Sequence, residues 1–151
     1  MASRQIAQRV LSVGGFIANH AAITPTAIAV ECCGRRLTYS ELHDRAGAQA
    51  YDLRQTGIER EVLVGVLMER SVDVATAIAG ILAADGAYLP LDSRAPAERL
   101  RWMIEDSGAA AVIVDRHLAG LARSLNAAAR IIVLDDVLDE GMRSTPHDLD
   151  P

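Results

Sequence analysis

The sequence predicts an α/β fold: a mostly parallel sheet with helices on both faces, preceded by an N-terminal helix and a short β-hairpin. From residue 58 onward, apolar runs alternate with helix-like segments, which is typical of parallel strands joined by crossover helices. The run 63–68 is nearly all apolar, as expected of a strand buried on both faces. Residues 62–99 have the order strand, helix, strand, a unit that almost always closes right-handed.

The N-terminal helix is predicted over residues 3–20. Apolar side chains recur there at helical spacing, and we expect them to pack on the core. Gly14 and Gly15 lie inside the segment. Because glycine lowers helix stability, we expect the helix to be weakened or broken at this pair.

A β-hairpin is predicted next. Residues 27–31 have the composition of a short strand, and Gly34 separates them from the second strand at 35–39. A strand, a turn containing glycine and a further strand are typical of a hairpin. Arg35 and Arg36 fall on the second strand, where we expect them to be solvated edge charges.

The helix that follows the hairpin has signals at both ends. Thr38 and Glu41 have the spacing of a capping box, in which each side chain accepts a hydrogen bond from the backbone of the other residue. Gly57 is expected to end this helix. Ser71 is the expected N-cap of the next helix, with Asp73 favourable in its first turn.

The remaining elements continue the alternation. Pro96 is expected at the first position of a helix that ends at Gly108. A short helix is marked by apolar residues between 118 and 125. The strands are predicted at 63–68, 87–91, 110–114 and 131–134. The whole α/β domain is expected to span residues 1–135, with a flexible acidic tail at 136–151.

Composition excludes several classes of function. The net charge is −5, and all fifteen basic residues are arginine, with no lysine. The acidic balance argues against a nucleic-acid partner. Without lysine, the chain has no phosphate-loop lysine and no Schiff-base lysine. No secretory signal and no run long enough to span a bilayer are visible, so we expect a cytoplasmic location and no membrane partner.

The two cysteines, Cys32 and Cys33, are adjacent. On a strand they would point to opposite faces and would not bridge each other. We therefore interpret them as reduced structural thiols. The histidines are scattered without the spacing of a metal site, and they are His20, His43, His117 and His147.

No catalytic constellation is visible. The glycine-rich patterns that cradle phosphates are absent. Arg70 lies between a strand and a helix N-terminus, where an anion is able to bind, but pairing with a carboxylate or with a helix end is the favoured interpretation. Asp92 follows a strand at the edge where α/β proteins bind ligands, and a loop-fixing hydrogen bond is favoured there. The acids from Asp135 onward are expected to be solvated.

Two segments resemble core motifs of the adenylation domains of nonribosomal peptide synthetases. The first covers residues 37–42 and the second residues 82–92, in the right order and separation. Ala83 and Asp85 stand where the second motif usually has lysine and glycine. The residues that carry the resemblance, which the family uses mainly for structure, are Leu37, Thr38, Tyr39, Glu41, Leu42, Gly86, Ala87, Tyr88, Pro90 and Asp92.

Asp85 is the departure with a structural consequence. If the glycine of the family adopts a positive φ, an aspartate there costs on the order of 1 kcal/mol. Gly86, next along the chain, is the alternative residue to take over the turn.

The resemblance implies part of the large subdomain of an enzyme that activates an amino acid with ATP and Mg²⁺. In the family, the phosphate loop, the amino-acid pocket and the catalytic lysine lie downstream of the segment matched here. We therefore expect no catalytic or metal residue and no bound cofactor in this chain alone. A C-terminal adenylation fragment or another synthetase protein is expected to complete it. The alternative is a non-catalytic interaction module, with a homodimer as one form.

Overall fold

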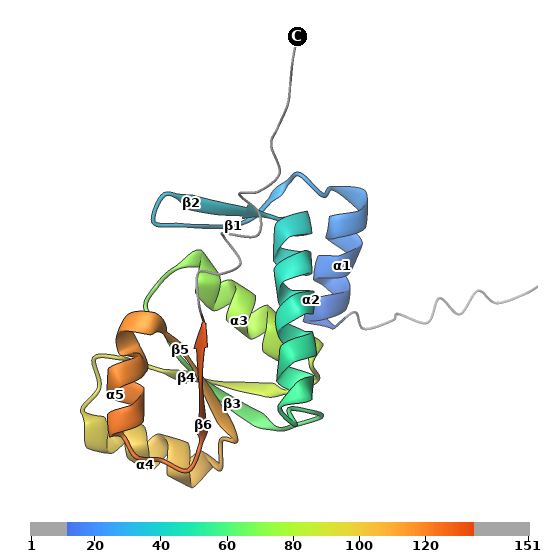
Figure 1. Cartoon of the computed structure of the whole chain (residues 1–151). Helices are drawn as coiled ribbons and strands as arrows, with labels where there is room; N and C mark the ends of the chain where they lie inside the picture. The colour runs from blue at the N-terminus through green and yellow to red at the C-terminus, as the bar shows by residue number, and fades with distance from the viewer. Residues whose placement is uncertain (1–11, 135–151) are drawn as a thin grey trace, which may run out of the picture.

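The computed structural model describes residues 12–134, and its centre is a four-stranded parallel sheet (Figure 1). The strand order is β4-β3-β5-β6. This confirms the predicted α/β class. The strands are β3 (Leu63–Leu67), β4 (Ala87–Leu91), β5 (Ala111–Asp115) and β6 (Arg130–Leu134).

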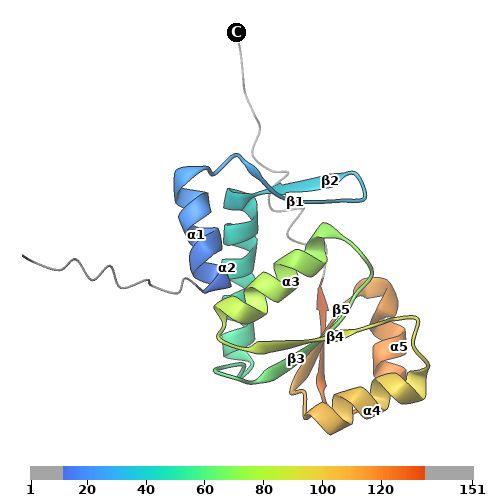
Figure 2. The same ribbon diagram turned by 180° about the vertical axis from the view of Figure 1, so that it is seen from behind.

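Helices cover both faces of this sheet, as predicted. On one face lie α2 (Tyr39–Gln55) and α3 (Val72–Ala83), and on the other lie α4 (Ala97–Ser107) and α5 (Ala119–Ser124), which follows the short 3-10 helix η1 (Arg116–Leu118) (Figures 1 and 2). The alternation of side chains along each strand explains this. In β5, Ile113 packs with α2 and α3, whereas Val112 and Val114 pack with α4 and α5.

A third layer is formed by α1 (Val13–Ile23), which lies beside α2 (Figure 1). Ser12 caps this helix by accepting a hydrogen bond from the N–H of Gly15 at 3.1 Å. The helix runs unbroken through Gly14 and Gly15. The predicted weakening is therefore not a break, and the glycine pair occupies the first turn. The earlier part of the predicted helix lies outside the described residues.

The predicted hairpin is present, formed by β1 (Ile28–Cys32) and β2 (Arg35–Thr38). Its two arginines form ion pairs, whereas the sequence predicted solvated edge charges. Arg35 forms an ion pair with Asp73 of α3 at 2.9 Å, and Arg36 pairs with Glu31 across the hairpin at 3.1 Å. The first pair ties the exposed hairpin to the start of α3.

The turn of this hairpin contradicts the expectation that the side chains of Cys32 and Cys33 point to opposite faces of a strand. Cys33 and Gly34 have φ values of +54° and +78°, so the chain is not extended at Cys33. The two side chains consequently do not diverge. The Sγ atoms of Cys32 and Cys33 lie 3.3 Å apart, and both cysteines are free thiols.

The turn between α3 and β4 settles the question raised by Asp85. Asp85 itself adopts a left-handed conformation with φ of +65°, so the alternative that Gly86 takes over the turn is wrong. Gly86 is required for a different reason. A Cβ atom there would lie 3.2 Å from Ile58, from Ile81 and from the carbonyl oxygen of Val62.

The remaining differences between the predicted and the observed helix ends are small. Pro96 is the N-cap of α4 and not its first helical residue, and Gly108 ends this helix with φ of +68°, as predicted. Ser71 is the N-cap of α3, but its side chain makes no capping hydrogen bond. Within residues 12–134, no helix is long and apolar enough to cross a bilayer. The predicted tail at 136–151 falls outside the described part of the chain.

Candidate functional site

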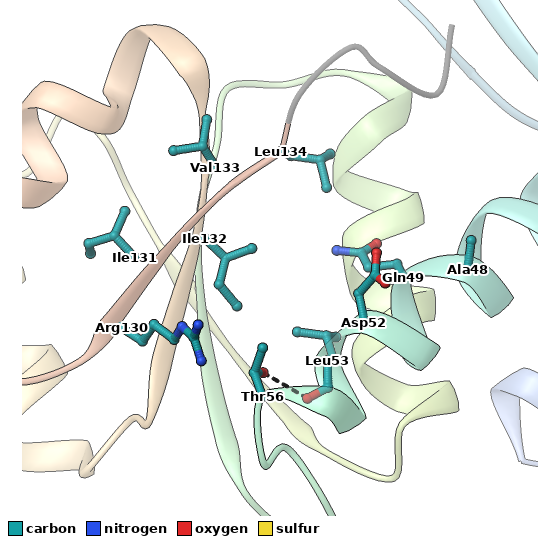
Figure 3. Close-up of a pocket in the computed structure, with 10 residues that line it drawn as sticks. All are labelled: Ala48, Gln49, Asp52, Leu53, Thr56, Arg130, Ile131, Ile132, Val133 and Leu134. Carbon is teal, nitrogen blue, oxygen red and sulfur yellow. Dashed lines mark hydrogen bonds between the residues drawn. The ribbon is translucent and has the colours of Figure 1, made fainter. Parts of the chain in front are cut away.

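A groove between α2 and β6 is one of the concave features of the described residues. It has a volume of ≈ 480 Å³, and β6 provides one complete wall (Figure 3). Its lining is mainly apolar and consists of Ala48, Gln49, Asp52, Leu53, Thr56, Arg130, Ile131, Ile132, Val133 and Leu134. We call this feature the α2–β6 groove.

The strand wall of the groove has an open edge. Within residues 12–134, β6 pairs only with β5, because it is the last strand of the sheet. Its outer N–H and C=O groups therefore have no ladder partner in the described chain. Such an edge is a template for the addition of another strand.

The helical wall carries a buried polar group without a partner. Gln49 is 7% exposed, and neither atom of its side-chain amide has a hydrogen-bond partner in the described structure. It is held there because α3 presents Gly80 to it, with no side chain in between. Figure 3 shows the Gln49 amide directed from α2 toward β6. A buried amide without partners is unfavourable.

The residues of the first core motif build the junction of the hairpin with α2. Leu37 and Leu42 are 3% and 5% exposed and belong to one apolar cluster. The capping box is complete: Thr38 accepts a hydrogen bond from the N–H of Glu41 at 3.2 Å, and Glu41 accepts one from the N–H of Thr38 at 2.8 Å. Tyr39 stacks on His20 of α1. These contacts are structural.

The second core motif forms β4, which is the other edge strand. Gly86 and Ala87 lead into the strand, and Tyr88 and Pro90 are exposed along it. Pro90 has no N–H, which suits an edge position. The motif ends at Asp92, directly after β4.

Asp92 fixes the loop after β4 through hydrogen bonds, which is the role that the sequence favoured for it. Its carboxylate accepts hydrogen bonds from the backbone N–H and from the guanidinium of Arg94, at 3.0 and 3.1 Å. The hydrogen bonds from Arg94, with that of the guanidinium the larger cause, lower the pKa of Asp92 below its ordinary value. Both side chains remain largely exposed to solvent.

The carboxyl ends of the strands form a hollow of ≈ 640 Å³ around Arg70, Asp92 and Arg94. Glu69 also lines it, and its N–H donates to Asp115 at 2.7 Å, a link that the sequence analysis missed. Its wall carries two carboxylates, of Glu69 and Asp92, and two guanidinium groups, of Arg70 and Arg94. Residues 12–134 contain no group of three metal-ligating side chains.

The family is shown by comparison with known proteins. Residues 17–149 match the model of the family described as AMP-binding enzyme. The chain belongs to the AMP-binding enzyme family. A relative in this family is tyrocidine synthase 3 of Brevibacillus parabrevis, which is 45% identical over 113 residues. Gramicidin S synthase 2 of Brevibacillus brevis is 41% identical over 110 residues.

Solved structures of the family agree with the fold. The nonribosomal peptide synthetase FmoA3 in its AMPPNP-bound form superposes with a TM-score of 0.75 at 34% identity, over 83% of this chain. Its form with bound α-methyl-L-serine-AMP gives 0.74 at 35% identity, over 81%. The chain thus corresponds to an N-terminal portion of an adenylation domain.

The match covers only a small part of these proteins. This chain spans 2% of tyrocidine synthase 3 and of gramicidin S synthase 2, from alignments that use 75% and 73% of its own residues. It spans 14% of the FmoA3 chain. The motif residues described above therefore belong to a segment of a much larger family fold.

Proposed function

We propose that this chain is the N-terminal scaffold of an adenylation domain that activates an amino acid. The domain would join the amino acid to ATP, release pyrophosphate, and pass the aminoacyl group from AMP to a carrier-protein thiol. ATP, accompanied by Mg²⁺, would be bound by other parts of the domain. The observation that carries the proposal is the match of residues 17–149 to the AMP-binding enzyme family, together with the match of 75% of the chain to tyrocidine synthase 3.

The α2–β6 groove supports a structural role for the segment. Its open strand edge and the partnerless Gln49 amide are features of a surface that is completed by further polypeptide. In our proposal that polypeptide is the remainder of the adenylation domain, on the same or another chain. The cytoplasm, which supplies ATP and amino acids, is the proposed location.

Amino-acid-dependent exchange of pyrophosphate into ATP tests the proposal. The chain alone is expected to show no exchange above background. Exchange should arise when a polypeptide that supplies the rest of the adenylation domain is added. Activity of the 151 residues alone would contradict the scaffold role. A stable dimer by light scattering, with no response to the added polypeptide, would favour the interaction module instead.

A further inference from the structure

The tip of the β1–β2 hairpin carries two thiols that lie close together. Cys32 ends β1 and is half-buried, and Cys33 is exposed in the turn. Their Sγ atoms are 3.3 Å apart. The left-handed conformation of Cys33 brings the side chains together, and Gly34, also left-handed, completes the turn. The folded backbone therefore holds both sulfur atoms on the same side of the turn.

A second contact holds Cys33 in place. The Cys33 Sγ lies 3.6 Å from the carbonyl oxygen of Arg70, to which it donates a hydrogen bond. This oxygen comes from the loop between β3 and α3, so the hairpin tip is linked to the α/β layer. The hydrogen bond with Cys33 raises the pKa of Cys32. Cys32 therefore stays a protonated thiol near neutral pH.

A direct disulfide does not suit this pair. The Cα atoms of a disulfide usually lie at least about 4.4 Å apart, whereas neighbouring Cα atoms across a trans peptide lie about 3.8 Å apart, so a disulfide between adjacent residues is strained. An atom that bridges the two sulfurs binds each of them separately, so the sulfurs need not come within bonding distance of each other. The sulfur separation then decides which kind of atom fits.

The separation favours a narrow angle at the bridging atom. With metal–sulfur bonds of about 2.3 Å, a tetrahedral ion needs sulfurs about 3.8 Å apart and a linear ion about 4.6 Å. With the same bonds of about 2.3 Å, the observed 3.3 Å corresponds to an angle of about 92°. Trivalent arsenic, which is pyramidal because it keeps a lone pair, has bond angles near this value.

We propose that Cys32 and Cys33 form a dithiol site for trivalent arsenicals. In the reaction with an arsonous acid, two As–O bonds break and two As–S bonds form. The two thiol protons leave with the two hydroxyl groups as two molecules of water. Arsenic stays trivalent throughout, so the step needs no oxidant or reductant.

Titration of the full chain with phenylarsonous acid tests the site. Intact-mass measurement should show one adduct per chain, bonded through both sulfurs, that resists excess glutathione and is removed by a small dithiol. Because the second sulfur binds intramolecularly, Cys32→Ser and Cys33→Ser should each weaken binding by roughly 10²–10⁴-fold. Two independent adducts per chain, or serine variants that bind as well as the parent, would overturn the proposal.

A second measurement separates the folded site from mere adjacency of two cysteines. Saturating phenylarsonous acid should raise the thermal unfolding midpoint of the parent chain, because binding to the folded state must be tighter than to the unfolded state. The Cys33→Ser variant should show no rise. Zinc should shift the midpoint less than the arsenical, because the separation is too short for a tetrahedral ion. A lowered midpoint, or a larger shift with zinc, would overturn the proposal.

Discussion

Gly80 permits the close packing of α3 on Gln49 of α2. A Cβ atom at this position would lie 2.8 Å from Gln49 Oε1 and 3.0 Å from its Cβ. We predict that Gly80→Ala lowers the free energy of unfolding by about 1–3 kcal/mol, as overpacking does. Urea unfolding is the measurement.

Gly47 provides the matched control for this substitution. It lies on the exposed side of α2, and nothing lies within 4 Å of the position of an added Cβ. Alanine there should raise the free energy of unfolding by about 0.8–1 kcal/mol through helix propensity. Equal effects of the two substitutions would mean that Gly80 is not a packing position.

Asp92 gives a residue-level prediction for pH dependence. Its pKa is lower in the folded chain than in the unfolded one, so the folded state gains stability above the unfolded pKa and loses it as the pH falls through the folded pKa. We predict that Arg94→Gln raises the pKa of Asp92 toward its ordinary value, measured by NMR titration of the carboxyl carbon. Arg101→Gln, which breaks a pair on α4, should leave it unchanged. An unaltered Asp92 pKa in Arg94→Gln would contradict the role of this pair.

At the scale of elements, the start of α2 is fixed by its capping box. We predict that Thr38→Ala lowers the free energy of unfolding by about 1 kcal/mol, because the N–H of Glu41 loses its partner. Thr38→Ser keeps a hydroxyl group and should retain most of this stability. A loss of the same size in both variants, measured by urea unfolding, would assign the effect to the lost methyl group.

Elements with strong local end signals are predictable from the sequence. The capping box and the glycine stop at Gly108 both follow from local chemistry and are observed. The left-handed residues Cys33 and Asp85 are not predictable in this way. A residue other than glycine adopts that conformation only where the surrounding chain closes a turn, and this closure is a property of the fold. The proximity of the two thiols was missed for this reason.

At the scale of the whole molecule, the sheet and its helix layers follow from the alternation of apolar runs with amphipathic segments. The α2–β6 groove does not, because its walls come from segments far apart in the sequence. Gln49 looks like an ordinary polar residue of a helix, and only the approach of Gly80 makes it a buried group without partners. The core motifs point to the family, whereas the groove depends on the tertiary structure.

The most direct test of the scaffold role is a graft. The part of this chain that aligns with tyrocidine synthase 3, 113 residues long, would replace the aligned segment of that protein. Amino-acid-dependent pyrophosphate exchange would then be compared between the graft and the parent domain. The account predicts that the graft is active with the amino acid of the host, because the scaffold contributes no group that selects the substrate. A folded graft that has no activity, or that prefers another amino acid, would contradict it.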